Sequence, residues 1–231
     1  MSEKLIIGMD NGIGGDIAIL SYSGKLIYYG NVPTIKEPMW KKPEVKFVRD
    51  KNNKIVKNKK GEKKTVTKHG HYTLIDMTAL KRLLVSHISV FSECECFLER
   101  PMVNIANNWQ IQSSISAGMA WAYAIHVFRT LELPFSYVDS RTYQKYFFPE
   151  ALVLKNPDGT KKHSKPGERN KQLKIEGKAM AQKLFPNAII KAPADGDALL
   201  IAEYNRLRLT KGVGDTYAED LKLWEATNNG N

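Results

Sequence analysis

The stretch Leu5-Ile6-Ile7-Gly8-Met9-Asp10-Asn11-Gly12 decides the fold of this 231-residue chain. It is an apolar run of strand length that ends in a turn signal, and Asp10 stands at its edge. A carboxylate at the edge of a buried strand is costly unless it is paired or binds a cation. Glu99 has the same kind of position, because it closes the apolar run Cys96-Phe97-Leu98. Asp197 opens the apolar run 198–202. A fold that brings these three residues together would build a site for a divalent metal ion.

Two fold families end their first strand in an Asp-x-Gly turn, and both fit Asp10. In RNase H-like nucleases the Asp binds metal, whereas in the actin and sugar-kinase group the turn holds a nucleotide phosphate. The later glycine-rich adenosine motif of the kinases is not evident here, which favours the nuclease. A plain surface turn is the third interpretation of Asp10. For Glu99 the alternative is an ion pair with Arg100, and for Asp195 or Asp197 it is helix capping.

The composition is typical of a soluble globular protein, with 42% hydrophobic and 26% charged residues. No apolar stretch approaches the ~20 residues of a membrane span, and the N-terminus has no signal-peptide pattern. Cys94 and Cys96 lie two apart in a strand-like run, where bridging them would need a strained geometry. We therefore expect free thiols in a reducing compartment, the cytoplasm. No Walker A, nucleophilic serine or zinc-finger spacing is present, so we expect no small-molecule cofactor.

Positive charge is concentrated in two segments. The net charge is +11, and residues 36–68 hold thirteen Lys/Arg against four Asp/Glu. Residues 155–174 hold seven against two, which leaves the rest of the chain slightly acidic. Local clusters of Lys and Arg indicate a polyanion as partner, and solvated insertions are the alternative.

The hydrophobic periodicity predicts an α/β protein with one mixed sheet of five strands and helices on both faces. The expected strands are 4–10, 17–22, 26–32, 94–99 and 135–138. Two expected helices are capped by Asp76 and Ser140, and the others begin at Trp109, Asn170, Asp195 and Tyr217. We expect a single domain, 1–231, with basic insertions at 33–72 and 149–169 and a C-terminal tail at 212–231. Short strands at 45–48 and 54–56 would pair inside the first insertion.

Three motifs in this order resemble the RuvC family of Holliday-junction resolvases. They are Ile-Gly-x-Asp-x-Gly at Asp10, Leu-Glu at Glu99 followed by a loop and a long helix, and Asp-Ala-Leu-x-Ile-Ala at Asp197. The resemblance covers roughly residues 1–32 and 74–209, and the Lys-rich additions look like those of divergent phage members. It implies an RNase H-like fold, a homodimer, and symmetric cutting of four-way DNA junctions with Mg²⁺ or Mn²⁺ in bacterial or phage-infected cytoplasm.

Carried over by motif, the resemblance makes Asp10, Glu99 and Asp197 metal ligands. The family has a second Asp three residues before the last one, where this chain has Ala194. Asp195 stands two residues before Asp197, and that spacing does not share a helix face. Asp195 can therefore complete the site only if it lies outside the helix, in a turn that Gly196 permits.

The family also places lysines near the scissile phosphate. By position these correspond to Lys174 and Lys145, and exposed helix lysines are the alternative. The sequence thus predicts a Mg²⁺-dependent, structure-selective endonuclease that uses two metal ions and binds branched DNA. A broader RNase H-like nuclease acting on flaps, forks or RNA–DNA hybrids is the first alternative. A non-catalytic junction-binding protein is the second.

Overall fold

The computed structural model describes residues 3–38, 44–57, 62–63, 65–68, 71–88, 93–100, 111–153, 158–159, 167–192 and 195–229. The chain divides into two compact units, one formed by residues 34–74 and the other by residues 1–33 and 75–231. Each unit is described by itself. The prediction of one domain with insertions at 33–72 and 149–169 and a tail at 212–231 remains a prediction.

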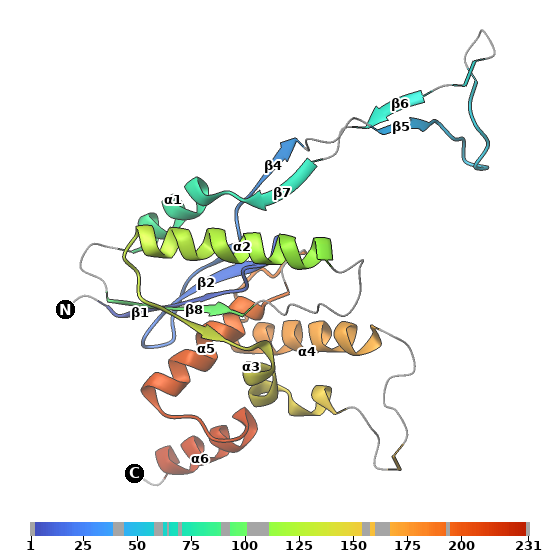
Figure 1. Cartoon of the computed structure of the whole chain (residues 1–231). Coiled ribbons are helices and arrows are strands. Elements are labelled where there is room, and N and C mark those ends of the chain that lie inside the picture. Colours follow the sequence, from blue (N-terminus) through green and yellow to red (C-terminus); the bar gives the residue numbers. More distant parts are fainter. Residues whose placement is uncertain are drawn as a thin grey trace. The chain divides into compact units, whose positions relative to one another are not determined.

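The larger unit contains a five-stranded mixed sheet (Figure 1). Its strands are β1 (Leu5–Met9), β2 (Asp16–Ser21), β3 (Leu26–Asn31), β8 (Cys94–Glu99) and β9 (Phe135–Val138). The spatial order is β3-β2-β1-β8-β9, with β1, β2 and β3 antiparallel and β1, β8 and β9 parallel. The predicted α/β fold class is confirmed, and the first and fourth core strands are adjacent, as an RNase H-like sheet requires.

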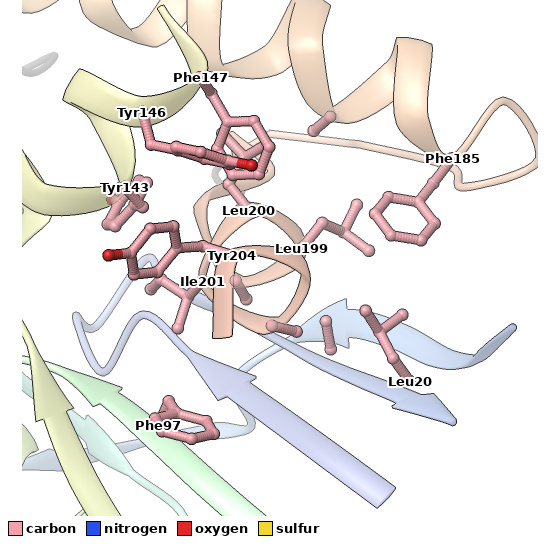
Figure 2. Packing of buried hydrophobic residues seen from close by; sticks show 14 of the residues in the cluster. Leu20, Phe97, Tyr143, Tyr146, Phe147, Phe185, Leu199, Leu200, Ile201 and Tyr204 are labelled. Carbon is pink, nitrogen blue, oxygen red and sulfur yellow. The ribbon is translucent and has the colours of Figure 1, made fainter. Parts of the chain in front are cut away.

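Helices cover both faces of this sheet. Every residue of β1 and β2 is buried as a result. The helical elements of this unit are α1 (Met77–His87), α2 (Ile111–Thr130), α3 (Ser140–Phe147), the 3₁₀ turn η2 (Pro149–Leu152), α4 (Glu168–Leu184), α5 (Asp197–Thr210) and α6 (Tyr217–Asn229). Successive strand residues point to opposite faces. Ile7 accordingly packs in one core with residues of α1 and α2, whereas Ile6 packs in the other with residues of α3, α4 and α5. Figure 2 shows this second core, which includes Tyr143 of α3 and Leu199 and Leu200 of α5.

The contact of α5 with β1 depends on Gly8. A methyl group at Gly8 would collide with the backbone of Ala198 and Ala202. Glycine therefore lets the start of α5 lie directly on the strand. Since Gly8 is two residues before Asp10 and Ala198 directly follows Asp197, this close contact brings the two predicted ligands together.

Most predicted elements are present, and the differences lie at their ends. Asp76 caps α1 as expected, because its side chain accepts a hydrogen bond from the Ala79 amide at 2.9 Å. The prediction that Ser140 caps a helix is wrong by one residue, since Ser140 is the first helical residue of α3 and Asp139 has the cap position. The helix expected from Asp195 begins at Asp197 instead. The start of the helix expected at Trp109 lies outside the described residues.

Residues 34–74 form two short two-stranded sheets. Strand β4 (Thr34–Pro38) pairs with β7 (His71–Ile75), and β5 (Glu44–Phe47) pairs antiparallel with β6 (Thr65–Lys68). The expected pairing of 45–48 with 54–56 is wrong for most of its length, because 44–47 pairs with β6. It holds next to the turn, where the Val56 amide donates a hydrogen bond of 2.8 Å to the Val48 carbonyl and Arg49 forms an isolated bridge with Ile55.

The sequence also leads to expectations for the two cysteines and for membrane-spanning helices. Cys94 and Cys96 are buried thiols on β8 that form no disulfide, and burial raises the pKa of both. A raised pKa keeps a thiol protonated and poorly reactive, so both residues pack as small apolar groups. None of the helices in the described part of the chain combines the length and apolarity that a bilayer span requires.

Candidate metal centre

Asp10 and Glu99 lie side by side at one end of the sheet. Met9 pairs with Leu98 in the parallel register of β1 and β8. Asp10 and Glu99 are the next residues along these two neighbouring strands. The Asn11 side chain donates a hydrogen bond of 2.9 Å to the Glu99 carbonyl and ties the two strand ends together. The Asp10 carboxylate accepts one from the Gly12 amide at 3.0 Å, which fixes its direction in the turn.

Asp195 and Asp197 reach the same place from the start of α5. Gly196 has φ of 93°, a left-handed conformation that favours glycine, and it separates Asp195 from the helix that Asp197 begins. The predicted condition for Asp195 is therefore met, because it lies in a turn outside the helix. One carboxylate oxygen from each of Asp10, Asp16 and Asp195 lies within 4.8 Å of the other two. Among the described residues, the predicted ligands Glu99 and Asp197 are outside this group; they line the neighbouring pocket, and the Asp10 charge raises the pKa of both.

The electrostatics show that these carboxylates are short of compensating charge. Burial raises the pKa of Asp10, Glu99 and Asp197, and nearby carboxylates raise it further. The Gly12 amide and Lys174 act in the opposite direction on Asp10, but the net pKa shift is upward. Protons or cations are needed to neutralise such a cluster. A divalent cation would bind the ionised forms and displace the protons.

The two predicted lysines have different positions. Lys174, on α4, forms an ion pair of 2.8 Å with Asp195, so it belongs to the acidic cluster. Lys145 lies elsewhere and lines a cavity of about 350 Å³ together with Arg141 and Tyr204. Lys174 thus lies beside the carboxylates, whereas Lys145 lines a separate cavity.

A pocket of about 230 Å³ opens on the cluster and combines both signs of charge. Glu99 and Asp197 line it on the acidic side, and its basic residues are Arg141, Arg169 and Lys174. The Nε atom of Arg169 is buried and has no hydrogen-bond partner among the described residues. Guanidinium groups match phosphate geometry well. The pocket therefore offers anion-binding groups next to a cation-binding cluster.

Sequence reasoning missed Asp16. It is fully buried at the start of β2, and its carboxylate accepts hydrogen bonds from the Tyr29 hydroxyl and from the Gly196 and Ala198 amides. Burial raises the pKa of Asp16 to about 7, even though the Tyr29 and Ala198 hydrogen bonds lower it. The signal was available, since Asp16 directly precedes the apolar run Ile17-Ala18-Ile19-Leu20 just as Asp10 follows one.

Tyr143, on α3, was also missed as a residue of the site. Its side chain is fully buried, and its hydroxyl has no hydrogen-bond partner of standard geometry among the described residues. The hydroxyl nevertheless lies close enough to Asp197 to lower that carboxyl's pKa. It is therefore an unsatisfied donor at the acidic cluster, where a carboxylate or a metal-bound water would accept from it.

The donor set fits a hard divalent cation. Mg²⁺ and Mn²⁺ prefer oxygen ligands, and Mg²⁺ is usually held by one or two carboxylates with waters and substrate phosphates. Asp10, Glu99, Asp195 and Asp197 supply such oxygens, and the raised pKa values of three of them show the charge that a cation would neutralise. Asp16 already accepts three hydrogen bonds, so it differs from the other four.

Comparison with known proteins yields likenesses of fold. No protein-family model matches the chain, and the search of curated proteins found no match. Among solved structures, Thermus thermophilus RuvC in complex with a Holliday junction substrate is similar at 10% identity and a TM-score of 0.46, covering 90% of this chain and 97% of that one. A second Thermus thermophilus RuvC structure has 11% identity and a TM-score of 0.42, covering 90% and 96%.

Proposed function

We propose that this protein is a divalent-metal-dependent DNA endonuclease that cuts four-way junctions. The observation that carries the proposal is the meeting of half-buried carboxylates from the end of β1, from β8 and from the start of α5, with raised pKa values and Lys174 nearby. A cluster this acidic repels a phosphodiester unless cations neutralise it. The charge of the cluster therefore supports a metal-dependent reaction on a polyanion.

In this proposal Asp10, Glu99, Asp195 and Asp197 hold Mg²⁺ or Mn²⁺, with two ions in each site. Bound metal would activate the attacking water and stabilise the leaving oxygen. Lys174 orients Asp195 through their ion pair and places a positive charge beside the reacting phosphate. The basic side of the pocket holds the neighbouring phosphates through Arg141 and Arg169.

The proposed substrate rests on the sequence motifs, which resemble those of the RuvC family. The four-way junction is therefore the first DNA to test. The Lys-rich residues 36–68 and 155–174 would bind backbone phosphates without reading bases. A homodimer would set two active sites a fixed distance apart and give paired nicks. We place this activity in the bacterial or phage-infected cytoplasm, where branched DNA forms.

Cleavage of a synthetic four-way junction with Mg²⁺ tests the proposal, using the wild-type chain, Asp10→Asn and the exposed control Glu225→Gln. Paired symmetric nicks in the wild type and the control, lost in Asp10→Asn, would support a junction resolvase. Equal cutting of flaps or RNA–DNA hybrids would instead support the broader nuclease. Tight junction binding without any cutting would rule out the enzyme and leave a binding protein.

A further inference from the structure

We propose that Asp16 is a positioning residue that fixes Asp10 and Asp197 relative to each other, and that it does so without binding the metal itself. This inference rests on the proposed function, because it concerns the same acidic cluster. Asp16 makes one connection through its main chain and another through its side chain.

The main-chain connection reaches Asp10. The Asp10 amide donates a hydrogen bond of 3.1 Å to the Asp16 carbonyl, just beyond the last residue pair of the β1–β2 ladder. This bond closes the loop between the two strands at its base. The backbone of Asp10 is thereby held to β2 at the residue whose side chain makes the second connection.

The side-chain connection reaches both neighbours of Asp197. The Asp16 carboxylate accepts hydrogen bonds from the Gly196 amide at 3.1 Å and from the Ala198 amide at 3.2 Å. These amides belong to the start of α5, where the first N–H groups of a helix lack partners within the helix. Gly196 has the cap position but no side chain to satisfy them. Asp16 thus caps α5 from another element, and its negative charge also suits the helix dipole.

Tyr29 fixes the orientation of this carboxylate. Its hydroxyl, on β3, donates a hydrogen bond of 2.7 Å to the same Asp16 oxygen that accepts from Gly196. Asp16 is fully buried, so all three donors would lose their acceptor in a low-dielectric surrounding if the carboxylate turned away. The carboxylate therefore has one well-defined orientation.

These bonds explain why Asp16 can lie near the ligands without being one. One of its oxygens is within 4.8 Å of oxygens of Asp10 and Asp195, a distance that also suits direct coordination. Turning toward a metal would take the carboxylate away from two buried backbone amides, and a buried donor without an acceptor destabilises the fold. The hydrogen bonds thus favour the positioning role, which opposes the mutual repulsion of the ligand carboxylates.

The chain contains a matched control in Asp220. Asp220 is also a buried aspartate that accepts from a tyrosine hydroxyl, Tyr146 at 2.8 Å, and from a backbone amide, Gly214 at 2.9 Å. Asp16→Asn and Asp220→Asn each replace an accepting carboxylate oxygen by an NH₂ group, which is itself a hydrogen-bond donor. Both variants are therefore expected to lower the melting temperature. Only Asp16→Asn disturbs the bonds that flank Asp197.

The experiment compares both variants in the full chain by three readouts. They are the melting temperature without metal, Mn²⁺ affinity by calorimetry or electron paramagnetic resonance, and hydrogen exchange of the Gly196 and Ala198 amides. We expect Asp16→Asn to weaken Mn²⁺ binding about 10–100-fold, the usual effect of losing a residue that orients a ligand, and to speed exchange at both amides. We expect Asp220→Asn to lower only the melting temperature.

Three results decide the inference. Wild-type Mn²⁺ affinity in folded Asp16→Asn would overturn it, and so would a loss as complete as in Asp10→Asn, which would make Asp16 a ligand.

If Asp16→Asn does not fold, Tyr29→Phe replaces it, because that variant removes only the orienting hydroxyl. Tyr29→Phe should weaken Mn²⁺ binding a few-fold, and unchanged affinity would again overturn the proposal. Failure of the wild type to bind Mn²⁺ or cut DNA would refute the proposed function instead.

Discussion

The acidic cluster and the inserted unit 34–74 use aspartates in opposite ways. In the cluster, carboxylates are buried or half-buried and gather at the end of the sheet, where backbone amides, hydroxyls and Lys174 oppose their charge. In the insertion, Asp50 is exposed and shapes a tight turn by accepting hydrogen bonds of 2.9 Å from the Asn52 and Lys54 amides. One region concentrates negative charge at the edge of the core, and the other exposes positive side chains to water.

This difference indicates which properties each region controls. The cluster has fixed geometry, because its residues are tied to strands and a helix of the core, and chemistry on a phosphodiester needs such precision. The insertion has exposed basic side chains around its turn, including Lys51, Lys54 and Lys57, and phosphate binding by point charges tolerates variable geometry. We expect changes in the cluster to affect the rate of cutting and changes in the insertion to affect binding.

The largest expected effect is a loss of cleavage without a loss of junction binding. Asp10→Asn should reduce single-turnover cleavage by about 1,000-fold or more, because it removes a metal-binding charge from the reacting centre. Junction binding, measured with Ca²⁺ in place of Mg²⁺, should stay within a few-fold of wild type. Loss of binding together with cleavage would show that the cluster and the DNA-binding charges are not separate. Glu225→Gln, an exposed acidic residue of α6, is the control.

A smaller effect distinguishes the two lysines that the sequence alone could not separate. Lys174→Gln removes the ion pair with Asp195 and the positive charge beside the reacting phosphate, so the single-turnover rate should fall about 10–100-fold. Lys145→Gln should weaken DNA binding more than it slows the chemical step, because Lys145 lines a different cavity. Rapid-quench kinetics at saturating DNA would measure the single-turnover rate of both variants. Equal rate losses in the two variants would contradict the distinction.

The insertion should control affinity. Replacing Lys51, Lys54 and Lys57 by Gln should weaken junction binding about tenfold and lower the slope of log K against log[salt] by about 0.9 for each phosphate that the variant no longer neutralises. The rate at saturating DNA should not change. The matched control carries the same loss of charge at exposed positions of α1 and α6, as Lys81→Gln, Arg82→Gln and Lys222→Gln. An equal loss of affinity in that control would show that only net charge matters.

The smallest effect concerns stability and pH. Carboxyl groups whose folded pKa lies above the unfolded value of about 4 bind more protons when folded, so stability falls as pH rises through that interval. For Asp16 the interval ends at about pH 7. With a chelator, the melting temperature should therefore fall between pH 5 and 7, by roughly 2–4 °C per kcal/mol lost. Excess Mg²⁺ should reduce the fall, because it binds ionised ligands. A melting temperature that rises over this range without metal would contradict the shifts.

The core could be predicted from sequence because its signals are local. The apolar runs before Asp10 and Glu99 fix two strands and their ends, and the predicted bounds of β8 are correct. The sequence could state only a condition for Asp195, because its position depends on the left-handed backbone of Gly196. The role of Asp16 could not be read locally, since its hydrogen-bond partners on α5 lie 180 and 182 residues away.

The pairing within the insertion was mispredicted for a different reason. A strand with one buried face has its register fixed by the hydrophobic pattern, and a Lys-rich ribbon has no such pattern. Val45–Val48 and Lys54–Val56 looked like partners because they are close in sequence. The structure pairs Glu44–Phe47 with Thr65–Lys68 instead, across a longer connection.

Anomalous diffraction from crystals grown with Mn²⁺ tests the central claim most directly. We predict anomalous peaks among the carboxylates of Asp10, Glu99, Asp195 and Asp197, with Asp16 still bonded to the Gly196 and Ala198 amides. Crystals of Asp10→Asn under the same conditions should lose at least one peak. A wild-type crystal without a peak in the cluster, at Mn²⁺ concentrations that support cleavage, would contradict the claim that these carboxylates form the metal centre.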